Sequence, residues 1–358
     1  MKEGDVYLKL AEGWGYPNSS RFLRILETIM TPEEGRLLLG LPAPTPEELA
    51  KRLNVDQEGV KTKLHELARR GLVIIGKRGY AAPIALGQLH DASLSSAEEH
   101  IPPEVYDLWK DFYYAELREG SVDILTREWL TAEGLPYMRV LPAWKAIEAS
   151  PAIRPEQVLP CEDMREILKR AEKRAVVACP CRRVLRECDN PLGVCLQLNR
   201  TAEYAINRGA AERELSVAEA IAIMEEAQEA GLVHTVGNSA VTQRVICNCC
   251  RCCCALIDAL VHYEKLHEGM SPSRFRTSVD EELCTGCQDC VERCPFGAIE
   301  MRSSASSRRL KAAVDTKRCM GCGVCVFKCS PGALTLELAR PPEHIPQPTA
   351  PAAAPKSS

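Results

Sequence analysis

Cysteines at regular spacings are the residues of this sequence best suited to do chemistry. The segment CTGCQDCVERCPFGAIE, residues 284–300, has four of them, separated by two, two and three residues, with a proline after the last. At C-x2-C-x2-C spacing, three thiolates of one tight loop can reach three corners of an iron–sulfur cubane, and glycines let backbone N–H groups approach its sulfides. Zinc sites and inert buried thiols are the alternatives. The spacing favours iron–sulfur clusters, which exchange single electrons without a catalytic side chain.

The pattern occurs twice in the chain. A shift of 35 residues maps one set of nine residues, Val279, Asp280, Cys284, Gly286, Cys287, Cys290, Cys294, Gly297 and Ala298, onto a second set, Val314, Asp315, Cys319, Gly321, Cys322, Cys325, Cys329, Gly332 and Ala333. Two copies of one unit, made of a strand, a cysteine loop and a helix, are therefore expected.

This pair of motifs resembles the bacterial two-cluster ferredoxin over residues 275–338. The resemblance implies that the fourth cysteine of each motif binds the other cluster. One 4Fe-4S cluster is then held by Cys284, Cys287, Cys290 and Cys329, and the other by Cys319, Cys322, Cys325 and Cys294. The family has a proline after each fourth cysteine; Pro295 fits, but Ser330 stands before Pro331, which alters the local turn and leaves the ligands in place.

Eleven of the 19 cysteines remain, and ten of them form two further groups. In ICNCCRCCC, Cys247, Cys250 and Cys253 again read C-x2-C-x2-C, and a predicted helix follows, whose positive N-terminus suits a third cluster with a fourth ligand from elsewhere. The other group is Cys179, Cys181, Cys188 and Cys195. Its C-x-C spacing is tight for one cubane, so a fourth cluster and zinc both stay open. Cys161 is isolated and is expected to be a buried thiol.

Composition limits the compartment and the partners. The sequence begins without an apolar export signal, and in a reducing cytoplasm clustered cysteines are more often metal ligands than disulfides. No apolar run approaches the roughly 18 residues that a membrane span needs. The formal net charge of −4 gives no basic excess for a dedicated nucleic-acid binder. We therefore expect a soluble cytoplasmic protein without a membrane span.

The elements near the N-terminus have a recognisable order. Residues 45–83 predict helix, turn, helix and two short strands, with Thr45 as the first helix cap and Gly71 ending the second helix. This resembles the winged helix-turn-helix of bacterial regulators over residues 20–85. Asp56 and Glu58 stand where a reading helix would enter the DNA groove, and carboxylates there repel phosphate. DNA binding is therefore possible but not favoured, and docking to another protein fits better.

The rest of the chain predicts an α+β multidomain protein with a central mixed α/β part. Residues 87–101 look like a linker, and the aromatic stripe of the next helix is expected in a core. A strand delivers Cys179 to its end, and His234 is expected to be a hydrogen-bonded strand histidine. The expected domains are a winged helix-turn-helix at 1–86, a helical linker region at 87–160, a Cys-rich iron–sulfur domain at 161–270, a ferredoxin domain at 275–338 and a disordered tail at 340–358.

The segments ACPCRR, EAGLVHTVGN and ICNCCRCCC ahead of a two-cluster ferredoxin resemble prokaryotic ferredoxin-like 4Fe-4S proteins over residues 20–338. We expect a multi-cluster electron-transfer protein of anaerobic metabolism, relaying single electrons between a donor and a redox enzyme. The alternatives are a redox-sensing transcriptional regulator acting through the winged helix, and an enzyme whose central cluster has an open iron site. A carrier or redox subunit is favoured over a stand-alone enzyme, and the oligomeric state is not determined.

Overall fold

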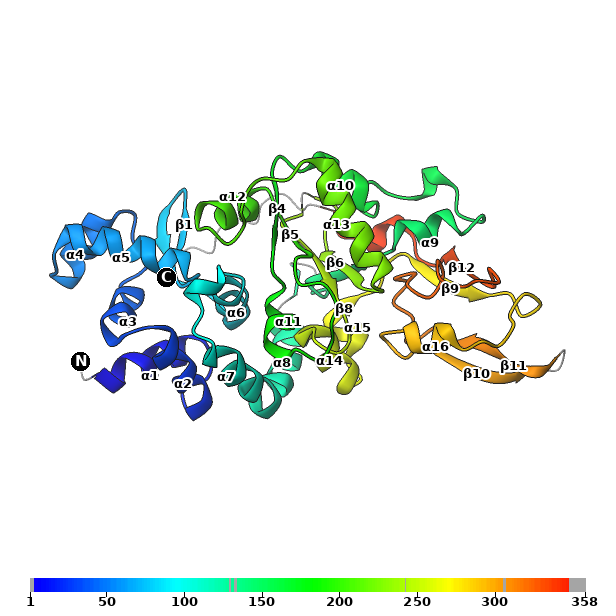
Figure 1. The fold of residues 1–358 in the computed structure, drawn as a ribbon, viewed down its shortest axis with the longest axis horizontal. Helices are drawn as coiled ribbons and strands as arrows, with labels where there is room; N and C mark the ends of the chain where they lie inside the picture. Colours follow the sequence, from blue (N-terminus) through cyan, green and yellow to red (C-terminus); the bar gives the residue numbers. More distant parts are fainter. Residues whose placement is uncertain (1–2, 129, 132–133, 242, 305–306, 348–358) are drawn as a thin grey trace. The chain divides into compact units, whose positions relative to one another are not determined.

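The chain forms two compact units, each assembled from two stretches of sequence (Figure 1). The computed structural model describes residues 3–128, 130–131, 134–241, 243–304 and 307–347. Unit 1 consists of the chain up to Gly120 and of Lys173–Ser216, and unit 2 consists of Ser121–Glu172 and the chain from Val217 onward. This interleaving differs from the consecutive domains expected from the sequence.

The first stretch of unit 1 is helical and contains a β-hairpin. Its helices are α1 (Glu3–Gly13), α2 (Ser20–Ile29), α3 (Pro32–Leu39), α4 (Pro46–Leu53) and α5 (Gln57–Arg69), and the antiparallel hairpin is β1 (Ile74–Gly76) and β2 (Gly79–Ala81). Helices α2 to α5 each begin after a capping residue whose side chain accepts a hydrogen bond from the backbone N–H three residues later. The capping residues are Ser19, Thr31, Thr45 and Asp56 in turn. The carboxylate of Asp56 is thus engaged as the cap of α5.

Residues 87–101, where the sequence suggested a linker, contain most of helix α6 (Leu86–Leu94), which is largely buried, followed by a 3-10 turn at Glu98–His100. Polar residues made this segment look exposed. The structure satisfies them internally: the Ser93 hydroxyl donates to the Leu89 carbonyl at 2.7 Å, and Arg208 donates to the hydroxyls of Ser95 and Ser96, each at 2.7 Å. The partner that makes burial possible lies more than 100 residues away in sequence.

The predicted aromatic stripe lies in a core, as expected. It belongs to α7 (Glu104–Phe112), whose Trp109 and Phe112 are buried, and the ring of Phe112 stacks on Phe22 of α2 at 5.3 Å between centroids. The helical path continues through a π-helical turn at Tyr113–Leu117, helix α8 (Arg118–Asp123) and a second π-helical turn at Ile124–Glu128.

The second stretch of unit 1 carries its cysteines. Strand β4 (Arg174–Val177) pairs antiparallel with β5 (Cys195–Leu198), and Val177 lies opposite Cys195. Helix α11 (Pro180–Leu185) follows β4, and α12 (Arg200–Asn207) follows β5. Ala175, Val177, Ala202 and Ala205 form a small apolar core that also contains Cys179 and Cys195.

Unit 2 is built around strands in the order β7, β6, β3, β8. These are β7 (Val245–Cys249), β6 (Val233–Gly237), β3 (Met138–Leu141) and β8 (Met270–Ser271), of which β3 and β8 pair parallel and the others antiparallel. On one face, Val140 and Val233 pack with Ile257 and Leu260 of α14 (Ala255–His262). On the other face, the side-chain amide of Asn248 donates a hydrogen bond to the sulfur of Met224 in α13 (Val217–Glu229). Shorter helices are α9 (Trp144–Glu148), α10 (Met164–Arg170) and α15 (Leu266–Gly269), and a 3-10 turn covers Pro155–Gln157.

The last part of unit 2 contains the repeat predicted from the 35-residue shift. Strand β9 (Phe275–Val279) pairs antiparallel with β12 (Leu334–Leu338), and β10 (Ile299–Ser304) with β11 (Ser307–Val314). Each pair joins the strand before one cysteine loop to the strand after the other, with Val279 opposite Leu334 and Ile299 opposite Val314. The first copy has the helix α16 (Asp289–Arg293), whereas residues 324–328 of the second copy form turns.

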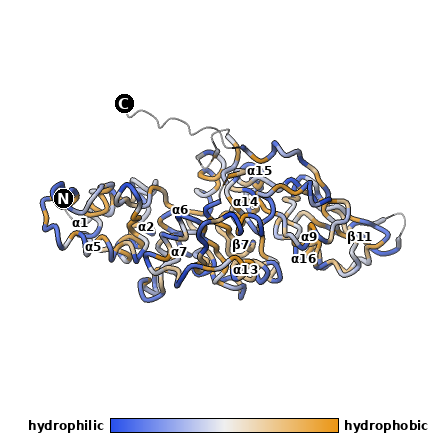
Figure 2. The backbone as a smooth tube through the Cα atoms, turned by 90° about the horizontal axis from the view of Figure 1, so that it is seen from above, coloured by the Kyte–Doolittle hydropathy of each residue, from blue (hydrophilic) through white to orange (hydrophobic). Residues whose placement is uncertain are grey.

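The chain end and the hydropathy pattern complete the fold. Residues 340–347, included in the predicted disordered tail, are placed against unit 2: a 3-10 turn covers Pro342–His344, and His344 hydrogen-bonds the Pro272 carbonyl. The remainder of that predicted tail, 348–358, lies outside the described residues. Apolar and polar residues alternate along the chain (Figure 2), and among the described residues no helix is long and apolar enough to cross a membrane.

Candidate metal centres

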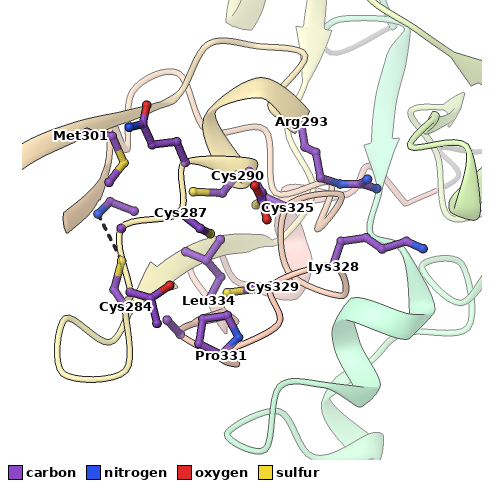
Figure 3. Close-up of a pocket in the computed structure, with 16 residues that line it drawn as sticks. Cys284, Cys287, Cys290, Arg293, Met301, Cys325, Lys328, Cys329, Pro331 and Leu334 are labelled. Carbon is purple, nitrogen blue, oxygen red and sulfur yellow. Dashed lines mark hydrogen bonds between the residues drawn. The ribbon is translucent and has the colours of Figure 1, made fainter. Parts of the chain in front are cut away.

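One cavity in unit 2 is lined by five cysteines from both repeats (Figure 3). Cys284, Cys287 and Cys290 come from the first cysteine loop, whereas Cys325 and Cys329 come from the second. Met301, Ala312, Leu334 and the charged residues Arg293 and Lys328 line the rest of the wall, among others. The structure therefore brings together the four residues that the ferredoxin resemblance assigned to one cluster.

The first cysteine loop is held in place by β11. Gly286 has a φ of +77°, and a Cβ there would lie 2.6 Å from the Leu310 carbonyl oxygen, so both the conformation and the close approach require glycine. Lys311 Nζ donates to the Cys284 carbonyl at 2.5 Å, and the Ala312 N–H donates to Cys284 Sγ at 3.5 Å. Donors to a thiolate sulfur of this kind tune the potential of a bound cluster.

The other four predicted ligands are also neighbours. Burial raises the pKa of the Cys322 thiol well above its usual range, and Cys325, Cys294 and Cys319, which lie close by, raise it further. The Ala298 N–H donates to Cys294 Sγ at 3.3 Å, and the Thr277 hydroxyl lies 3.5 Å from Cys325 Sγ.

The thiol chemistry of both groups fits a 4Fe-4S cluster. Burial, with the neighbouring cysteines adding to it, raises the pKa of the Cys290 thiol in the first group to about 11. Four thiolates cannot lie together in such surroundings unless a positive core offsets their charge, and iron and sulfide supply that core.

The second loop is the more enclosed of the two. A Cβ on Gly321, whose φ is +66°, would lie 2.1 Å from the Phe275 carbonyl oxygen, and Ser273 Oγ donates to the Gly321 carbonyl at 2.7 Å. The Ala143 N–H donates to the Cys322 carbonyl at 2.9 Å. Cys319, Cys322 and Cys325 are all buried, whereas Cys287 in the first loop is exposed. The two centres thus differ in their access to solvent.

Three cysteines of the ICNCCRCCC segment form a third group in unit 2. The sulfur atoms of Cys250, Cys252 and Cys253 lie within 4.8 Å of one another. Spacing had grouped Cys250 and Cys253 with Cys247, which lies on the preceding strand β7. Cys254 caps α14, so the group stands just before the N-terminus of that helix, as the sequence predicted. The structure adds Cys252, which the C-x2-C-x2-C pattern leaves out.

A fourth group of cysteines lies in unit 1. Cys179 and Cys195 share a hydrogen bond between their thiols, which together with burial raises the pKa of Cys179 well above its usual range; Cys181 contributes to the same rise. Cys179 follows β4 and Cys195 begins β5, so the strand pairing brings these two together. Cys188 lies in the connection between them, where its sulfur accepts a hydrogen bond from Asn190 at 3.2 Å.

Sequence reasoning missed two polar residues beside this group. His90 and Asp91 of α6 place ligand atoms within 4.8 Å of each other and of Cys181 Sγ, and His90 Nδ1 lies 2.9 Å from Asp91 Oδ1. An adjacent His-Asp pair was the only available signal, and it stood in a segment interpreted as a linker. Nothing in the sequence linked it to a cysteine 91 positions away.

Two other residues singled out in the sequence, His234 and Cys161, are buried or partly buried and take part in hydrogen bonds. His234 on β6 is fully buried and hydrogen-bonds Asn248 on β7 through Nδ1; burial lowers its pKa to about 4, so the ring is neutral near pH 7. Cys161 is partly buried; burial raises the pKa of its thiol, and its carbonyl accepts a hydrogen bond from Arg139 at 2.6 Å.

Comparison with known families identifies one part of the chain. Residues 266–333 match the model of the 4Fe-4S dicluster domain. Searches of curated proteins and of solved structures found no match. The matched segment contains both cysteine loops and all eight cysteines of the first two groups described above, because it runs from before Cys284 to beyond Cys329. Residues 266–333 are therefore a 4Fe-4S dicluster domain, which implies two 4Fe-4S clusters and iron–sulfur redox chemistry.

Proposed function

We propose that this protein relays single electrons between a donor and a redox enzyme in the cytoplasm of an anaerobically metabolising cell. The observation that carries the proposal is the arrangement of the dicluster domain, in which each cysteine loop lies beside a cysteine of the other repeat. A bound 4Fe-4S cluster supplies reversible one-electron transfer. Cys294 and Cys329 tie the two loops together, so the chain fixes two redox centres at one separation.

The residues around the sulfurs support this role. Ala312, Ala298 and Thr277 present N–H or O–H groups to Cys284, Cys294 and Cys325. Such donors stabilise negative charge on the ligand sulfur and therefore favour the reduced state. Electron exchange also requires little movement, and the loops are held by backbone contacts to β11 and to the segment before β9.

The central cysteines extend the proposal to further metal centres. We assign a third cluster to Cys250, Cys252 and Cys253, with Cys247 and a thiol from elsewhere in the chain as candidates for the fourth ligand. For Cys179, Cys181, Cys188 and Cys195, a fourth cluster and zinc remain the two alternatives. The nitrogen of His90 and the oxygen of Asp91 beside Cys181 favour zinc, which accepts mixed sulfur, nitrogen and oxygen ligands.

The N-terminal helices are proposed as a winged helix that docks to protein. Helices α4 and α5 precede the hairpin β1–β2, and the Asp56 carboxylate stands at the start of α5, the helix that would read DNA. A surface depression along α5 is lined by Glu47, Asp56, Glu58 and Glu66 as well as by cations, so it offers phosphate no uniform attraction. Weak, non-specific DNA binding is expected in either redox state.

Substitution of Cys294 by Ser tests the paired arrangement. The anaerobically purified variant should lose about four iron atoms, the content of one cluster. Its residual electron paramagnetic resonance spectrum after dithionite reduction should match that of Cys322→Ser, not that of Cys287→Ser, because Cys294 lies with Cys322. Cys161→Ser is the control and should keep all of its iron. A residual spectrum matching Cys287→Ser would refute the arrangement.

Co-purification from the native cell tests the relay itself. A redox enzyme or an electron-donor protein should accompany the anaerobically purified protein. A footprint at a defined operator that changes on reduction would instead support the regulator, and a spectrum perturbed by a small substrate would support the enzyme with an open iron site.

A further inference from the structure

We infer that the edge formed by β11 and the loop Cys284–Cys287 is a docking surface for a redox partner whose contact face is acidic. The inference rests on the proposed electron-transfer function and specifies where the exchange takes place. It is carried by the exposure of one cysteine, by the contacts of β11 with its loop, and by the side chains that border it.

Exposure selects the site of exchange within the dicluster domain. Electron transfer between proteins falls off steeply with distance, so a partner must approach the centre that lies closest to the surface. Cys287 is exposed, whereas Cys319, Cys322 and Cys325 are buried. The loop Cys284–Cys287 is therefore the part of the domain that a partner can reach most closely.

Strand β11 borders this loop directly. A Cβ built on Gly286 would lie 2.6 Å from the Leu310 carbonyl oxygen and 3.9 Å from Arg309 Cβ. Lys311 donates to the Cys284 carbonyl at 2.5 Å. Residues 309–311 thus form the rim of the exposed loop, and whatever binds over Cys287 must meet them.

The rim is basic although the whole chain is acidic. The strands β10 and β11 carry four cationic side chains, Arg302, Arg308, Arg309 and Lys311, against the single carboxylate of Glu300, whereas the chain has a formal net charge of −4. Arg302 is paired with Glu300. Arg308 and Arg309 are exposed, and within the part of the chain that the structure describes neither has an ion-pair partner. Their charge is available to a binding partner.

Apolar side chains lie beside the same loop. Leu283, which precedes Cys284, is 51% exposed, and Leu310 is 47% exposed. Protein interfaces commonly combine an apolar centre with a charged rim that sets orientation and association rate. Glu281 and Glu282 stand next to Leu283, and they limit the basic surface on that side. The acidic face of the partner is therefore expected over Arg308 and Arg309.

Charge reversal at the rim tests the inference. The variant Arg308→Glu with Arg309→Glu is compared with Lys169→Glu with Arg170→Glu, an equal charge change on exposed residues of α10. The dithionite-reduced proteins are oxidised by tris(oxalato)cobaltate(III), an anion, and by hexaamminecobalt(III), a cation, in a stopped-flow instrument. Charge reversal at the rim should slow oxidation by the anion about tenfold and accelerate oxidation by the cation, because local charge steers the encounter of the protein with the oxidant. The control should change neither rate by more than about twofold.

High salt gives a second check on these rates. At about 1 M ionic strength, where the Debye length is only ~3 Å, the rates of wild type and of the rim variant should converge. The neutral variant Arg308→Gln with Arg309→Gln should fall between them at low salt. Equal rates for all variants at low salt would overturn the docking surface and leave the electron-transfer function standing. Failure of every protein to be reduced would count against the function instead.

Binding of an acidic polypeptide tests the surface without redox turnover. Fluorescently labelled poly-L-glutamate should bind wild type at low salt, and its apparent dissociation constant should rise at least fivefold in the rim variant but not in the α10 control. Iron content equal to that of wild type shows that the rim variant is folded. Equal binding by wild type and the rim variant would overturn the inference, whatever the result of the oxidation experiments.

Discussion

Hydrogen bonds to sulfur distinguish the two centres of the dicluster domain at the level of single residues. Thr277 is the only side-chain hydroxyl that the structure, within its described residues, places in a hydrogen bond to one of the eight predicted ligand sulfurs. Its hydroxyl is buried with Cys325, away from water that would replace it. A donor in such surroundings has a larger effect on the charge of the sulfur than one at the surface.

Thr277→Val should therefore make the buried centre harder to reduce. The substitution keeps the shape of the side chain and removes the donor. A net hydrogen-bond contribution of about 0.5–1.5 kcal/mol corresponds to a fall in reduction potential of roughly 20–60 mV. A redox titration followed by electron paramagnetic resonance measures it. Thr335→Val on the paired strand β12 serves as control, and a potential that stays the same or rises in Thr277→Val contradicts the assignment.

His234 makes stability depend on pH. Its pKa is about 4 in the folded chain and 6.5 when unperturbed, so the unfolded chain binds more protons between these values. The contribution of the neutral ring to the free energy of unfolding is fully present above pH 6.5 and is lost as pH falls toward 4. At pH 5.5 the loss is about 1.4 kcal/mol, from one pKa unit.

His234→Leu removes this titration. The variant also loses the hydrogen bond to Asn248, and the free-energy cost of that loss is the same at every pH. The difference in denaturation temperature between wild type and variant should therefore shrink when pH is lowered from 7.5 to 5.5. A difference that is the same at both values would mean that the ring does not titrate as described.

At the scale of elements, glycines decide how closely a strand can approach a cysteine loop. Gly286→Ala combines a positive φ with a Cβ 2.6 Å from the Leu310 carbonyl oxygen, so β11 must move away from the loop. Gly332 also has a positive φ, of +66°, but nothing lies within 4 Å of the position of its Cβ.

These two positions make a matched pair of alanine variants. We expect Gly286→Ala to lose about four iron atoms, one cluster. Gly332→Ala should keep its iron and cost only about 1–2 kcal/mol of conformational strain. Iron analysis of the two purified variants decides, and full iron content in Gly286→Ala would show that the contact with β11 is not required.

The same scale shows what the sequence could predict. The two cysteine loops and their flanking strands follow from residues close together in the chain, and the 35-residue repeat doubled the signal. Helix α6 was not predicted, because the serines that follow it, Ser95 and Ser96, are buried against Arg208, the C-cap of the distant helix α12. The approach of His90 to Cys181 also depends on packing between distant segments, for which the sequence has no local mark.

At the scale of the whole molecule, the iron and zinc content distinguishes between clusters and zinc in the central cysteine groups. Two clusters in the dicluster domain account for about eight iron atoms, and the other cysteine groups for about four to eight more, at four per cluster. Anaerobic analysis should give about 12 iron with one zinc if His90 and Asp91 take part in a zinc site, or about 16 without zinc. About eight iron atoms, with zinc as the remainder, would exclude clusters in both central groups.

Because Cys294 and Cys329 each lie with the cysteines of the other loop, the order of translation limits when each site can be completed. The N-terminal parts of a chain emerge first from the ribosome and begin to fold while the rest is made. Cys284, Cys287 and Cys290 emerge first, but the fourth thiol beside them is Cys329, which follows Cys290 by 39 residues. Neither centre can gain its full ligand set on a short nascent chain. The first site can therefore be completed only after Cys329 has emerged, and a truncation before Cys329 leaves three good ligands without a complete site.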